Sequence, residues 1–81
     1  MRVDKYLKIS RLIKRRTVAK EACGQGRILI NDKAAKPGSE VKVGDILTLG
    51  FAAKTIKVEI CDIKEHVRKE EATDLYRQLQ D

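Results

Sequence analysis

The apolar residues of this chain change their spacing at Gly24-Gln25-Gly26, from helical before this segment to alternating after it. Before it, we expect a first helix over residues 3–12 and a second helix that begins between Lys14 and Thr17 and ends at Gly24. Glycine favours such an end because it adopts left-handed backbone without strain. The two apolar faces are formed by Val3, Tyr6, Leu7 and Ser10, and by Val18, Ala19, Ala22 and Cys23.

The alternating part of the chain predicts short antiparallel strands joined by turns. We expect a first strand over residues 27–31, a tight turn at Asn31-Asp32 and a brief return over residues 33–36. Turns at Pro37-Gly38 and Gly44-Asp45 then lead to two further strands. The first of these carries Leu47, Leu49 and Phe51 on one face, and the second carries Ile56, Val58 and Ile60.

Residues 68–80 again have helical spacing, and we expect a terminal helix there, with Glu70 and Glu71 at its positive end. Its apolar face would pack on the core through Ala72, Leu75, Tyr76 and Leu79. The alternative is that Arg68, Lys69 and Arg77 contact a partner molecule. The order of elements predicts an α+β fold, with two N-terminal helices packed on a small antiparallel sheet and a C-terminal helix.

The 81 residues suffice for one small domain, and with only 4% aromatic residues its core must be mainly aliphatic. No apolar run approaches the roughly 20 residues of a membrane span, and no secretion signal is found at the front. We therefore expect a cytoplasmic protein. Cys23 and Cys61 are then expected to be reduced, buried thiols, and with only His66 to join them they make a poor metal set.

The residue types that catalysis needs are not grouped in this sequence. Ser10 and Ser39 have no histidine pattern nearby, and His66 stands alone among charged residues. Gly24 and Gly26 lack the third glycine and the preceding strand of a phosphate-binding loop. We predict a protein that is not an enzyme and that uses neither a cofactor nor a metal.

The whole chain has a formal net charge of +6, and this excess of positive charge lies entirely in the first third of the sequence. Residues 1–27 contain nine Lys and Arg against two acidic residues, a net charge of +7. Residues 28–81 contain nine against ten, a net charge of −1. A surface that only solvates a protein mixes the two signs, so this separation favours a polyanionic partner.

Arg11, Lys14, Arg15 and Arg16 lie together at the predicted start of the second helix. The helix dipole already makes this end positive, so the cluster is unfavourable unless an anion binds it. Phosphates suit the place, because free backbone N–H groups and cationic side chains both attract them. The second helix has few side chains that read DNA base edges, and the sheet lacks exposed aromatics for single strands. We therefore predict recognition of folded RNA through its shape and phosphates.

Residues 2–51 also contain a recognisable series of motifs. These are Arg2-Val3-Asp4, Lys14-Arg15-Arg16-Thr17, Gly24-Gln25-Gly26, Ile30-Asn31, and Val43-Gly44-Asp45 preceded by Lys36-Pro37-Gly38. The series resembles the S4 RNA-binding domain, named for protein four of the small ribosomal subunit. Asp32 stands where that family prefers glycine, a difference that concerns the turn and not the helices. The whole chain is most similar to the stand-alone bacterial members, namely the heat-shock protein fifteen group and those of ribosome-associated quality control.

The resemblance implies the alpha-L type of RNA-binding motif over residues 1–65, with residues 66–81 as a helical extension. It further implies binding to a large ribosomal subunit that still carries peptidyl-tRNA after a stalled ribosome has split. The partners would be 23S rRNA, peptidyl-tRNA and a tailing factor on the same subunit, and the protein would be a monomer that binds no membrane.

The resemblance also assigns residues. By position, Arg2, Asp4 and Arg16 match the RNA-facing motif, and we expect Asp4 to orient Arg16 or Arg2 by a charge-assisted hydrogen bond. The full predicted RNA-binding set is Arg2, Asp4, Lys8, Arg11, Lys14, Arg15, Arg16, Thr17 and Lys20.

Three alternatives stay open at this point. The chain is a general module for structured RNA that does not act on stalled ribosomes, or its basic face docks an acidic protein. A protein partner would stay bound after RNase digestion, which separates these two. The third alternative is a fragment of an RNA-modifying enzyme whose catalytic part lies elsewhere.

Overall fold

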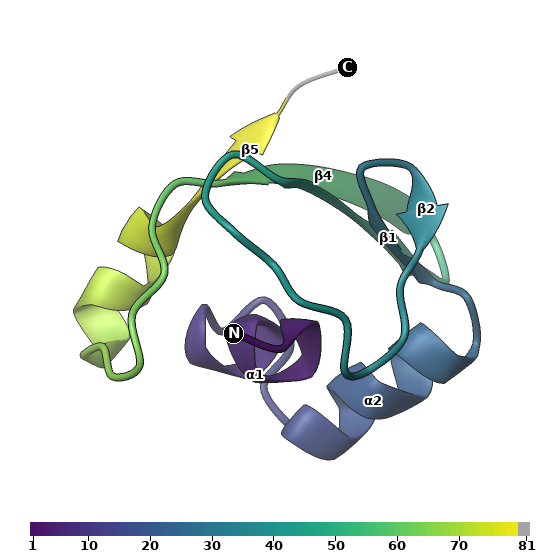
Figure 1. Ribbon diagram of the computed structural model, residues 1–81, viewed down its shortest axis with the longest axis horizontal. Helices are drawn as coiled ribbons and strands as arrows, with labels where there is room; N and C mark the ends of the chain where they lie inside the picture. Colours follow the sequence, from purple (N-terminus) through teal and green to yellow (C-terminus); the bar gives the residue numbers. More distant parts are fainter. Residues whose placement is uncertain (80–81) are drawn as a thin grey trace.

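The computed structural model describes residues 1–79 as a sheet with helices packed on one face (Figure 1). Five antiparallel strands are ordered β2-β1-β3-β4-β5. Helix α1 lies between α2 and the 3-10 helix η1, all beneath the sheet in the view of Figure 1. The elements are α1 (Val3–Ile9), α2 (Arg16–Gly24), β1 (Ile28–Ile30), β2 (Lys33–Ala34), β3 (Ile46–Phe51), β4 (Lys54–Ile60), η1 (Lys69–Leu75) and β5 (Tyr76–Leu79). The predicted α+β class is confirmed.

The first helix is shorter than the predicted 3–12. It ends at Ile9, after which Ser10 caps it and Arg11 adopts a left-handed backbone with φ of 62°. The Arg11 N–H bonds the Lys8 carbonyl at 3.1 Å, which closes the turn. Because the chain leaves the helical path at Arg11, the following loop brings Lys14 to the same hollow as Lys8 and Ile9 at the end of α1.

The hairpin between β1 and β2 turns at the predicted Asn31-Asp32, and both residues have positive φ, at 51° and 68°. This is the backbone that matches the twist of a two-residue hairpin. Aspartate tolerates left-handed backbone better than most residues, so Asp32 substitutes for glycine there without changing the turn. The Asn31 side chain secures the turn by accepting from the Ile46 N–H (2.9 Å) and donating to Asp45 (3.1 Å).

The core lies between α1 and the sheet and is mainly aliphatic, as predicted. Its largest fully buried members are Val3, Tyr6, Leu7, Ile28, Leu47, Leu49, Val58, Ile60 and Leu75. Phe51, predicted on the same face as Leu47 and Leu49, lies at the end of β3 and is 41% exposed. Both cysteines are free, but only Cys23 is buried, so the prediction that both are buried is wrong for Cys61.

The terminal helix predicted over residues 68–80 is the largest error in the predicted elements. Residues 69–75 form the 3-10 helix η1, and residues 76–79 form β5, which pairs with β4 at the sheet edge. Ala72 and Leu75 are buried because residues three apart share a face of a 3-10 helix. Beyond them, backbone pairing with β4 replaces helical hydrogen bonds. The last predicted helical residue, Gln80, lies outside the described residues.

Two negative findings hold for residues 1–79. No helix in this range is long and apolar enough to cross a bilayer. Likewise, no group of three or more His, Cys, Asp and Glu residues in the range could hold a metal ion.

Candidate nucleic-acid interface

Asp4, in the first turn of α1, is a fully buried carboxylate that joins two arginines distant in the sequence. One guanidinium nitrogen of Arg2 lies 3.1 Å from its Oδ2, and one of Arg16 lies 3.3 Å from its Oδ1. The Lys5 backbone N–H also donates to Oδ1, at 2.7 Å. The predicted hydrogen bond between Asp4 and one arginine is therefore found with both. A buried carboxylate is tolerated here because its oxygens all have charged or N–H partners.

Arg2 and Arg16 each pair with Asp4 through one guanidinium nitrogen, and both side chains are partly exposed to solvent. Their side chains are 48% and 39% exposed, so both arginines can also be reached from solvent. Arg2 is further positioned by backbone pairing with Glu40, and its guanidinium lies over Gly38, where an added Cβ would come within 3.8 Å. Arranged guanidinium groups of this kind suit forked contacts with phosphate oxygens.

The start of α2 has the features that the sequence predicted for an anion site. Its N-cap is Arg15, whose guanidinium has no acceptor for the free backbone N–H groups, and the first turn of α2 has no acidic residue. Thr17 and Lys20 are exposed, and Lys20 lies about one helical turn after both Arg16 and Thr17 on α2. The helix therefore presents unpaired N–H groups beside cations.

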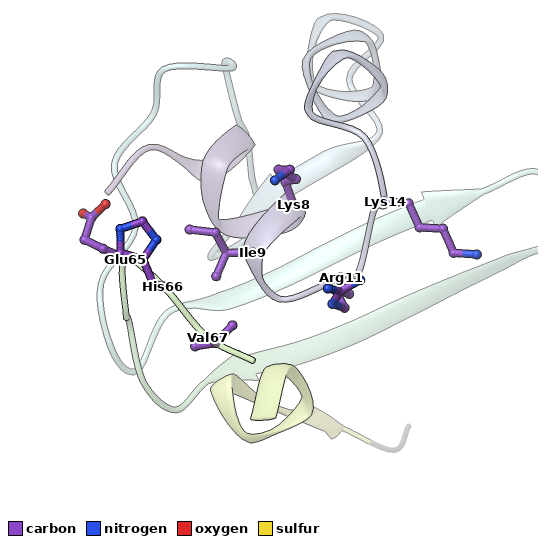
Figure 2. Close-up of a pocket in the computed structure, with 7 residues that line it drawn as sticks. All are labelled: Lys8, Ile9, Arg11, Lys14, Glu65, His66 and Val67. Atoms are coloured by element: carbon purple, nitrogen blue, oxygen red, sulfur yellow. The ribbon is translucent and has the colours of Figure 1, made fainter. Parts of the chain in front are cut away.

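The remaining predicted residues gather around a shallow hollow of about 200 Å³ at the end of α1 (Figure 2). Lys8, Arg11 and Lys14 line it from the first part of the chain. Opposite them lies the segment Glu65-His66-Val67, which follows β4 by several residues, and Ile9 completes the lining. Figure 2 shows His66 and Glu65 on the far side of the hollow from Lys14.

The predicted residues thus form two adjoining groups. Arg2, Asp4 and Arg16 meet in ion pairs, and Lys8, Arg11 and Lys14 share the hollow. Arg15, Thr17 and Lys20 are exposed at or near the start of α2. The segment 65–67 was not predicted, because it lies more than 50 residues further along the chain and no local pattern points from it to α1.

The arrangement of Arg2-Val3-Asp4 and the basic start of α2 has a counterpart among known domains. Residues 1–47 match the family model of the S4 domain. The chain belongs to the S4 domain family. The sequence resemblance is therefore confirmed over more than half of the chain.

Two relatives that match this chain over nearly its full length have the same name. A protein of Halalkalibacterium halodurans is 60% identical over 76 residues, covering 94% of this chain and 86% of its own length. One of Bacillus subtilis is 52% identical over 81 residues, covering all of this chain and 94% of its own. Both are named RQC P-site tRNA stabilizing factor, which agrees with the predicted similarity to stand-alone members of ribosome quality control.

A solved structure has the same fold over nearly the full length of this chain. Heat Shock Protein 15 of Vibrio cholerae, described as trimeric, superposes with a TM-score of 0.90 at 31% identity. The match covers 98% of this chain and 81% of that one. The likeness therefore includes the segment beyond residue 47, with η1 and β5.

Proposed function

We propose that this chain is a non-enzymatic RNA-binding factor that acts on the large ribosomal subunit in the rescue and quality control of stalled translation. In this proposal it is a cytoplasmic monomer that contacts 23S rRNA and peptidyl-tRNA, and a tailing factor acts on the same subunit. The single observation that carries the proposal is the Arg2–Asp4–Arg16 arrangement, in which a buried carboxylate holds two partly exposed arginines together on an S4 fold.

The names of the relatives support the ribosomal part of the proposal. A factor that stabilises tRNA in the P site must lie against folded RNA, and shape and phosphate contacts dominate such recognition. The RNA-binding residues we propose are those in the two groups and at the start of α2. They are Arg2, Asp4, Lys8, Arg11, Lys14, Arg15, Arg16, Thr17 and Lys20.

Co-sedimentation with purified large subunits carrying peptidyl-tRNA, over a series of salt concentrations, tests the proposal. A variant with Lys14→Ala, Arg15→Ala and Arg16→Ala should bind more weakly. Its log–log salt slope should also flatten by about 0.7 to 0.9 for each phosphate that is no longer neutralised. The matched control removes three exposed cations of the sheet, Lys33→Ala, Lys54→Ala and Lys57→Ala, at equal cost in net charge.

The control should retain most of the parent's affinity, because its cations lie outside the proposed interface. Equal weakening of both triple variants would mean that net charge alone attracts the subunit. Unchanged binding of the first triple variant would overturn the phosphate mechanism. Retention of a partner after RNase digestion would favour the protein-docking alternative instead.

A further inference from the structure

The hollow at the end of α1 contains three cations that have no carboxylate partner. Within residues 1–79, neither Lys8, Arg11 nor Lys14 forms an ion pair, whereas Lys5, Arg16 and Arg77 each do. Three unpaired cations that line one small volume make its electrostatic potential positive. Such a hollow attracts an anion.

The carboxylate on the rim of the hollow does not supply this anion. Glu65 is paired with Lys5, whose hydrogen bond lowers the pKa of Glu65 below its ordinary value. The carboxylate is therefore ionised and engaged with Lys5. This exposed pair lies where the segment that carries His66 and Val67 passes α1, and that segment forms the far wall of the hollow.

The hollow is not uniformly cationic, which narrows the class of ligand. Ile9 and Val67 are partly buried and pack against the core, leaving apolar atoms toward the hollow. The exposed ring of His66 stands beside them (Figure 2). A free phosphate uses only the cations, whereas a nucleotide has a phosphate for the cations and a flat base for the apolar and aromatic side.

We propose that this hollow binds one unstacked nucleotide of the RNA, with its phosphate among Lys8, Arg11 and Lys14 and its base against His66 and Val67. The inference rests on the proposed function and extends the RNA interface to a segment outside residues 1–47, which match the S4 domain. Lys14, which lines the hollow, lies two residues before Arg16, so the hollow lies near the start of α2.

His66 and Lys8 separate the two halves of this site experimentally. Binding of each variant to large subunits carrying peptidyl-tRNA is measured over a salt series. His66→Ala should weaken binding about fivefold or more with an unchanged salt slope, because it removes stacking and no phosphate contact. His66→Phe keeps an aromatic ring and should restore most of the affinity. Lys8→Ala should flatten the slope by about 0.7 to 0.9.

Two controls keep this test separate from that of the proposed function. Thr73→Ala changes an exposed residue of η1 and should bind like the parent. Arg16→Ala reports on the main interface. If Arg16→Ala weakens binding while His66→Ala does not, the nucleotide site is wrong and the proposed function stands. If Arg16→Ala also binds like the parent, the interface itself is wrong.

The source of the nucleotide follows from a second arm, in which the subunits carry no tRNA. A defect of His66→Ala in both arms assigns the nucleotide to rRNA. A defect only in the presence of peptidyl-tRNA assigns it to tRNA. Equal weakening by His66→Ala and His66→Phe, or an unchanged salt slope for Lys8→Ala, would overturn the site.

Discussion

At the scale of single residues, Asp4 is a positioning group and not a direct contact for RNA. Its carboxylate is fully buried beneath Arg2 and Arg16. Two guanidinium groups this close repel each other in the absence of an anion, and Asp4 supplies that anion from within the fold. The exposed sides of both arginines are then free for phosphate oxygens.

Replacing Asp4→Asn tests this role, because positioning and bulk charge predict opposite effects. The net charge rises from +6 to +7, which alone would tighten RNA binding. We expect weaker binding instead, by threefold or more, since the substitution removes the charge-assisted hydrogen bonds that orient both arginines. Affinity for large subunits at fixed salt is the measurement.

Glu59→Gln is the matched control for this substitution. Glu59 lies on β4 in the sheet, whereas Asp4 lies on α1. The substitution removes the acidic partner of Arg77 and raises the net charge by the same amount as Asp4→Asn. Its affinity should be unchanged or higher. Tighter binding by Asp4→Asn would show that Asp4 does not position the arginines.

Asn31 secures the β1–β2 turn, so its replacement should destabilise the protein. Asn31→Ala leaves the Ile46 N–H and the buried Asp45 carboxylate without their side-chain partner. It also places alanine in left-handed backbone. We expect the free energy of unfolding to fall by about 2 kcal/mol in urea titrations. Asp32→Gly, in the same turn, should be neutral or stabilising, and equal losses of stability in both would contradict this account.

At the scale of elements, the start of α2 is unfavourable for stability and favourable for an anion. Arg15 at the N-cap offers no acceptor to the free N–H groups and adds positive charge at the positive end of the dipole. Arg15→Ser should therefore raise the free energy of unfolding by about 0.5 to 1 kcal/mol and weaken RNA binding. Thermal unfolding and co-sedimentation measure the two effects. A variant with lower stability as well as lower affinity would show that Arg15 has a structural role.

The phenol of Tyr6 links α1 to the end of η1. Tyr6 is fully buried and donates to the Leu75 carbonyl at 2.8 Å, the same carbonyl that accepts from the Cys61 and Asp62 N–H groups. The pKa of Tyr6 is raised far above its ordinary value near 10. Burial of the phenol is the main cause, and the negative charge of Cys61 is the next largest. The folded protein therefore keeps a proton that the unfolded chain loses in alkali.

This difference predicts how stability depends on pH. The contribution of Tyr6 is complete below pH 10 and falls as the pH rises above it, since the unfolded state then binds fewer protons. Tyr6→Phe should lose about 1 kcal/mol at neutral pH and show a shallower loss above pH 10. Tyr76→Phe, which removes a half-buried phenol on β5, should keep the alkaline loss of the parent. Urea unfolding between pH 8 and 11 separates the variants.

The elements that could be predicted from sequence are those whose pattern is local. Both helices, the Asn31-Asp32 turn and strands β3 and β4 follow from apolar spacing and turn residues. The terminal helix was predicted wrongly because Ala72, Leu75, Tyr76 and Leu79 satisfy helical spacing equally well. The choice of a strand over residues 76–79 depends on pairing with Lys57 to Ile60, a non-local interaction that spacing does not contain.

At the scale of the whole molecule, the charge separation along the chain becomes a separation in space. Helices α1 and α2, with their N-caps and the loop between them, carry eight of the nine cations of the first third, and the strands and η1 belong to a remainder with a net charge of −1. Part of the candidate site could be predicted because Arg2, Asp4 and Arg16 belong to a recognisable motif. The wall formed by residues 65–67 could not, since only folding brings it to Lys8 and Arg11.

The unequal exposure of the two cysteines makes this protein easy to label at one position. Burial raises the pKa of the Cys23 thiol, with the Asp4 charge adding to the effect, so it will react slowly with maleimides. Cys61 is open to solvent and lies four residues before Glu65. A fluorophore attached there needs no engineered mutation and lies on the same connecting segment as Glu65 and His66, so it can report on titration of the protein onto its subunit.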